Sequence, residues 1–138
     1  MPEEKPRRLG LFAILLIAAF LVGFIPQWMK ARDQSAAREK AEHQLTVTRI
    51  VKDLGSAAID ARRGEYEPAR IATSTFFTAA HFEIDQSDKS ALTKQQRDAL
   101  APLLAPRDEL ITLLARSDAT SADKLVNLYV AVRKVLGV

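Results

Sequence analysis

The segment from Leu9 to Ile25 constrains the fold of this chain more than any other. Its sequence, LGLFAILLIAAFLVGFI, has seventeen residues, no charge and no side chain more polar than glycine. As a helix it would be about 25 Å long, and extension to Met29 gives about 31 Å, close to the ~30 Å hydrocarbon thickness of a bilayer. No core in a chain of 138 residues could surround an element that is apolar on every face. We therefore predict one transmembrane helix over residues 9–29, contacting membrane lipid.

The residues that follow this segment favour an uncleaved anchor. The apolar run exceeds the usual ~7–15 residues of a signal-peptide core, and no small-x-small cleavage site follows it. Trp28 would lie at the headgroup level, with Lys30 and Arg32 just beyond it as anchors. A cleaved signal peptide and a buried helix of a soluble protein are the alternatives.

The polar basic tail, residues 1–8, favours a cytoplasmic N-terminus, because short basic tails rarely cross a membrane. Residues 30–40 are hardly less basic, so charge alone barely decides the orientation. We predict a single-pass inner-membrane protein whose C-terminal domain is extracytoplasmic.

Charge and cysteine content exclude several functions. The net charge is +3, but the surplus lies before Asp53, and the rest of the chain is close to neutral. Nucleic acid would require a basic face on the folded domain, so we expect no nucleic-acid partner. The basic residues near the membrane segment suit anionic lipid headgroups. The chain has no cysteine, which excludes disulfides, thiolate zinc sites and cysteine nucleophiles.

The remainder of the chain predicts helices only. Residues 30–46 contain strong helix formers and few apolar side chains other than alanine, which is typical of a solvated helical stalk. In residues 47–138 apolar side chains recur at helical spacing, and no stretch alternates as a β-strand would. We predict an all-α chain, in which one transmembrane helix runs into the stalk and then into a small bundle of four or five short helices.

Local signals predict some helix ends within residues 47–138. Gly64 should end the first helix, since glycine favours the left-handed conformation that commonly follows a helix. Thr93, with Gln96 three residues later, forms a capping-box pattern at the start of the third helix. Thr120 and Asp123 have the same spacing and should cap the last helix.

Gly64, Tyr66 and Ala69 form the pattern G-x-Y-x-x-A. Through it, residues 51–80 resemble a helical hairpin of the tetratricopeptide type, in which glycine permits the turn, tyrosine lies between the helices and alanine allows their close approach. The large apolar residues that this family carries early in its first helix are mostly missing. The resemblance implies a protein-binding scaffold, and an ordinary helix–turn–helix of a bundle is the alternative.

Tyr66, Phe76 and Phe77 are the candidate partner-binding residues. Adjacent residues of a helix point about 100° apart, so Phe76 and Phe77 cannot easily share one small core. Either one of them is exposed at a groove or an oligomer interface, or both are buried between different neighbours.

No pattern predicts catalysis, a metal site or a cofactor. His81 and Glu83, with Asp85 and Asp88, form the only cluster of potential metal ligands, but one histidine with loop carboxylates does not resemble a zinc site. We expect a protein that is not an enzyme and that binds another protein, or itself, as an interaction or scaffold module of the bacterial cell envelope. A helical-bundle sensor domain and an accessory subunit of a membrane enzyme complex are the alternatives.

Overall fold

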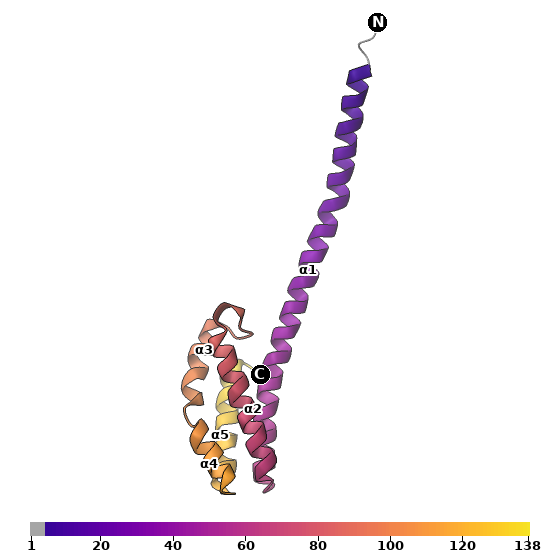
Figure 1. Ribbon diagram of the computed structural model, residues 1–138. Helices are drawn as coiled ribbons and strands as arrows, with labels where there is room; N and C mark the ends of the chain where they lie inside the picture. The colour runs from indigo at the N-terminus through magenta and orange to yellow at the C-terminus, as the bar shows by residue number, and fades with distance from the viewer. Residues whose placement is uncertain (1–4) are drawn as a thin grey trace. The chain divides into compact units, whose positions relative to one another are not determined.

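The computed structural model describes the backbone of residues 5–138 and the side chains of residues 9–24 and 26–138. Every regular element in residues 5–138 is helical, which confirms the all-α prediction. There are five α-helices and two short 3₁₀ helices in this range (Figure 1): α1 Lys5–Arg62, α2 Tyr66–Asp85, η1 Ser87–Lys89, α3 Lys94–Leu100, η2 Ala101–Leu104, α4 Arg107–Ala115 and α5 Thr120–Leu136.

The chain divides into two compact units between Lys40 and Ala41, and α1 contributes to both of them. In the first unit, all side chains described between residues 9 and 40 are exposed. The apolar segment predicted from the sequence is helical, and it is long and apolar enough to cross a membrane. Pro26 lies inside α1 without ending it. The charged residues that follow are helical too, as the sequence predicted for the stalk.

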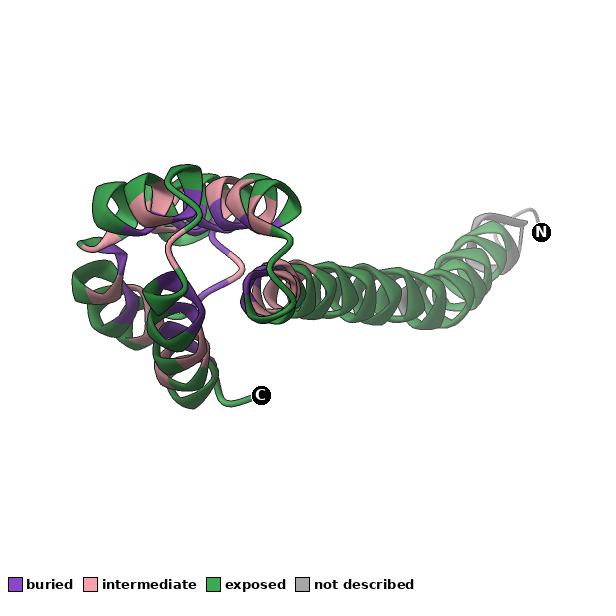
Figure 2. Cartoon of the chain, turned by 90° about the horizontal axis from the view of Figure 1, so that it is seen from below, coloured by how far each residue is buried: buried purple, intermediate pink, exposed green. Residues whose placement is uncertain are grey.

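The second unit, Ala41–Val138, has one hydrophobic core. Figure 2 shows the buried residues on the inner faces of its helices and the exposed residues on the outer faces. The predicted apolar stripe of α1 forms one wall of this core, because residues spaced by four and three lie on one side of a helix. The buried apolar residues are Ile50, Leu54, Ala57, Ala58, Ala61, Ala69, Phe76, Phe77, Ala80, Leu92, Leu100, Leu104, Leu110, Leu114, Ala122, Leu125, Leu128, Val132 and Leu136.

Successive helices of this unit run in opposite directions. α2 runs opposite to the C-terminal part of α1 (Figure 1). α3, η2 and α4 then run together in the direction opposite to α2, and α5 runs back alongside them. α2 packs against α4 and η2, and α5 packs against α3, η2 and α4. α1 approaches α5 closely at Gly55, where an added Cβ would lie 3.1 Å from Cε2 of Tyr129.

Two turns of the same geometry lie at one end of the unit. At Gly64 (φ +78°) the backbone N–H of Glu65 donates to the carbonyl of Asp60 (2.8 Å), which is the bonding pattern of a Schellman motif. After α4, Ser117 adopts the same conformation (φ +55°), and the N–H of Asp118 bonds five residues back. The helix end predicted at Gly64 is therefore confirmed.

The two predicted helix caps have different outcomes. The capping box of α3 is confirmed: the Thr93 hydroxyl accepts from the N–H of Gln96 (3.2 Å), whose side chain accepts from the N–H of Thr93 (2.9 Å).

The predicted pairing of Thr120 with Asp123 is wrong. Thr120 is already helical, and both its N–H (2.9 Å) and its hydroxyl (2.7 Å) donate to the Asp118 carboxylate. Asp123 instead forms an ion pair with Arg62 of α1 (2.9 Å), which joins the two turns.

Candidate protein-binding site

An open groove runs between α1 and α2 in the second unit. Its volume is about 550 Å³. Its walls carry mainly hydroxyl and small side chains, so the two helices leave space between them at the surface. The groove is lined by Thr46, Arg49 and Ile50 of α1 and by Ser74, Thr75, Thr78, Ala79, Phe82 and Glu83 of α2.

A row of exposed side chains runs along α2, and its members from Thr75 to Phe82 line the groove. Ile71, Thr75, Thr78 and Phe82 follow one another at spacings of four, three and four, which places them along one side of the helix. Ile71 is 55% exposed and Phe82 is 58% exposed. We call these four residues the α2 ridge. An exposed phenylalanine beside a hollow is a combination found at protein-binding surfaces.

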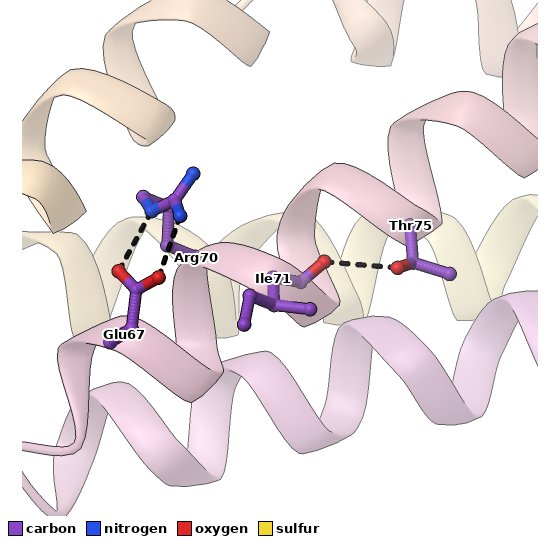
Figure 3. Close-up of polar contacts among 4 residues, drawn as sticks. All are labelled: Glu67, Arg70, Ile71 and Thr75. Atoms are coloured by element: carbon purple, nitrogen blue, oxygen red, sulfur yellow. Dashed lines mark hydrogen bonds and ion pairs between the residues drawn. The ribbon is translucent and has the colours of Figure 1, made fainter.

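Two sets of polar contacts lie in the first half of α2 near the ridge (Figure 3). Arg70 donates to both carboxylate oxygens of Glu67, at 2.9 and 2.6 Å. These hydrogen bonds hold the pKa of Glu67 below its usual value and raise the pKa of Arg70. The hydroxyl of Thr75 donates to the carbonyl of Ile71 (3.0 Å), which is how a threonine is accommodated within a helix.

Glu83 lines the groove and fixes the loop after α2. Its buried carboxylate accepts from the Ser90 hydroxyl (2.9 Å) and from the N–H of Ala91 (2.7 Å). Ser90 in turn accepts from the N–H of Leu92 (3.0 Å). A carboxylate used in this way anchors the loop, which gives Glu83 a structural role. Among the residues whose placement the structure describes, no three His, Cys, Asp or Glu side chains are grouped so that they could hold a metal ion.

Phe76 and Phe77 both lie in the core, fully buried, with ring centroids 5.0 Å apart in an edge-to-face arrangement. The alternative in which one of them is exposed is therefore wrong. Both can be buried because α2 has neighbours on two sides. α1 lies on the side of the groove, and α4 and η2 pack against another side of α2. Neither ring offers a surface to a partner of the folded domain.

Tyr66 is half-buried at the start of α2, packed against the core, and does not line the groove. A role for Tyr66 in partner binding stays a prediction.

The exposed apolar residues of the ridge, Ile71 and Phe82, were not among the predicted site residues. The sequence identifies them because they lie on a different side of the helix from the core residues of α2. They are separated by eleven residues, which brings them back to nearly the same side of a helix, and this side differs from that of Ala69, Phe76 and Ala80. An apolar row out of phase with the core marks a second surface.

A second, smaller hollow of about 330 Å³ lies between η2, α4 and α5. Pro102, Leu103 and Pro106 form one side of it, and an ion pair of Lys124 with Glu109 (2.6 Å) lies at its edge. Because Lys124 and Glu109 pair with each other, neither offers an unpaired charge to a ligand in this hollow.

Comparison of the chain with protein-family models, with curated proteins and with solved structures finds no match.

Proposed function

We propose that this chain is a single-span protein of the bacterial cell envelope whose helical bundle binds another protein through the α1–α2 groove and the α2 ridge. The apolar part of α1 is its membrane anchor. Its N-terminus is cytoplasmic and its helical domain extracytoplasmic.

The membrane anchor is supported by the composition and exposure of α1. No charged residue occurs from Leu9 to Met29, and the side chains described in that range are all exposed. An apolar helical surface of this length is stable in lipid, where an α-helix satisfies its own backbone hydrogen bonds.

The observation that carries the binding role is the exposed Phe82 beside the groove. The large apolar residues of the core are almost entirely buried, so the domain has a well-formed interior and does not need Phe82 for it. Phe82 is 58% exposed, so removing the exposed part of its ring from water on binding contributes about 1–2 kcal/mol. The small and hydroxyl side chains of the groove allow the backbone of a partner to come close.

An accessory subunit of a membrane enzyme complex would use the same surface, and the identity of the partner would distinguish that case. The two hollows of the second unit described above are open grooves, which suits a protein partner better than an enclosed small molecule.

The test is affinity purification of the full chain from its native membranes in mild detergent. We expect a stoichiometric partner protein with the unaltered chain. Phe82→Asp and Ile71→Asp place a charge on the ridge and should each reduce recovery of this partner at least tenfold. Val130→Asp is the matched control, since Val130 of α5 is 60% exposed but lies outside the groove.

Circular dichroism must show the same helix content and melting temperature for all three variants. A partner recovered equally with Phe82→Asp and Val130→Asp would contradict a binding role for the ridge. Recovery of the chain alone, as a monomer, would contradict the binding function itself. A partner that proves to be a second copy of the chain would place self-association at this surface.

A further inference from the structure

We propose that the segment from Trp28 to Asp33, where α1 leaves its apolar run, selects anionic phospholipids from the surrounding bilayer. This inference rests on the proposed membrane anchor and goes beyond it, because an anchor alone requires no preference among lipids. We call residues 28–33 the exit segment.

The first observation is the position of Arg32. Its guanidinium carbon lies 5.0 Å from the centroid of the Trp28 ring, which is cation–π geometry. Side chains of an α-helix lean toward its N-terminus, so Arg32 folds back toward the apolar run. Tryptophan rings concentrate at the headgroup level of membranes. The charge of Arg32 is therefore held at the depth of the lipid phosphates.

The second observation is that a second cation lies on the other side of the helix. Lys30 is two residues from both Trp28 and Arg32, which places it about 160° around the helix from each of them. Lipids on two sides of α1 thus meet a positive charge.

These charges are not matched by any acidic side chain that the structure describes. Among the side chains that the structure describes, neither Lys30 nor Arg32 forms an ion pair, and Asp33 is the only acidic residue of the exit segment. Arg32 also retains its hydrogen-bond donors, since a cation–π contact uses the face of the aromatic ring and not the guanidinium N–H groups.

The chemistry favours a lipid that is itself negatively charged. A zwitterionic headgroup pairs each phosphate with its own ammonium group, whereas phosphatidylglycerol leaves the phosphate uncompensated. A basic residue near an anionic surface gains about 1 kcal/mol, which corresponds to a factor of about five. Two cations and one anion leave one net charge, so we expect about a fivefold enrichment of anionic lipid around the exit segment.

The chain carries its own probe of this enrichment, because Trp28 is its only tryptophan. The full chain is reconstituted in equal mixtures of phosphatidylcholine and phosphatidylglycerol, with bromine atoms near the headgroup end of the acyl chains of one lipid or of the other. Bromine quenches tryptophan fluorescence on contact. The ratio of the two quenching efficiencies therefore measures the lipid composition next to Trp28.

We expect brominated phosphatidylglycerol to quench as if enriched about fivefold. Arg32→Gln or Lys30→Gln should bring the enrichment close to one, and Asp33→Asn should raise it. Arg38→Gln is the matched control, since it lies about 9 Å farther along the helix, about one Debye length at physiological salt, and should change the enrichment less than twofold. In 1 M salt the preference should shrink, because the charges are screened.

Equal quenching by the two lipids, or a preference unaffected by Arg32→Gln and by salt, would overturn the selectivity while leaving the membrane anchor intact. No quenching by either lipid would show that Trp28 does not contact the bilayer, and this result would overturn the anchor as well.

Discussion

Replacement of Thr73 by valine should stabilise the domain. Thr73 lies in the middle of α2 and is fully buried, and its hydroxyl oxygen has no hydrogen-bond partner among the described residues. A threonine inside a helix usually bonds back to a carbonyl of the preceding turn, as Thr75 does with Ile71. Thr73 therefore carries the cost of a buried hydroxyl without the compensating bond.

The size of the effect follows from that cost. An unsatisfied buried polar group is unfavourable by about 1–3 kcal/mol in mutational data. Valine has nearly the same shape as threonine and similar helix propensity, so Thr73→Val removes the hydroxyl without leaving a large cavity. We expect the free energy of unfolding to rise by about 1 kcal/mol. For a domain of this size that raises the melting temperature by about 4–8 °C.

The assay is thermal unfolding of the full chain in mild detergent, followed by circular dichroism. Thr75→Val is the matched control in the same helix, because its hydroxyl is exposed and bonded (Figure 3). An exposed substitution of this kind should shift the free energy of unfolding by less than about 0.5 kcal/mol.

A Thr73→Val variant that is destabilised, or no more stable than the parent, would refute the reasoning. It would show that the hydroxyl has a partner after all, such as an ordered water.

Three further predictions concern stability. A fragment of residues 41–138 should be soluble and should unfold cooperatively by circular dichroism, since it contains the entire buried core; a gradual, non-cooperative melt would contradict this. In that fragment Leu114→Ala should lower the free energy of unfolding by about 2–5 kcal/mol, measured in urea, because Leu114 is only 1% exposed, whereas Ala37→Ser in the full chain should change it little. Hydrogen bonds from the backbone N–H and, to a lesser extent, the hydroxyl of Thr120 lower the pKa of Asp118 in the folded state. The stability that they contribute is present above the unfolded pKa of Asp118 and is lost as the pH falls through its folded pKa. Asp118→Asn should therefore flatten the dependence of stability on pH below about pH 4, and an unchanged dependence in this range would argue against these bonds.

The parts of the fold that the sequence predicted are those determined by neighbouring residues. A helical stripe such as Ile50, Leu54 and Ala61 is visible because its spacing repeats within the helix itself. The turn at Gly64 and the capping box at Thr93 also involve residues only a few positions apart.

The points that the sequence left open or predicted wrongly depended on residues far apart in the chain. Whether Phe76 and Phe77 share a core depends on α2 having neighbours on two sides, which no local pattern reveals. Asp123 was expected to cap its own helix, but Arg62, sixty-one positions earlier, pairs with it. Gly55 attracted no prediction, because the close approach of Tyr129 is a property of the packed helices.

The candidate site was missed for a related reason. Phe82 was not among the predicted site residues, because no pattern of neighbouring residues sets it apart from the core residues of the same helix. Its 58% exposure follows from the rotation of α2, which the burial of Phe76 and Phe77 fixes. Comparing the phases of two apolar rows on one helix would have identified the α2 ridge.

The most direct test of the membrane anchor is the intact mass of the chain together with its partition after an alkaline carbonate wash of membranes. We predict that the chain is recovered in the membrane pellet with residues 1–29 still attached. A shorter chain that begins near Ala36 to Arg38 and is found in the soluble fraction would show that the apolar segment is a cleaved signal peptide, and it would contradict the account.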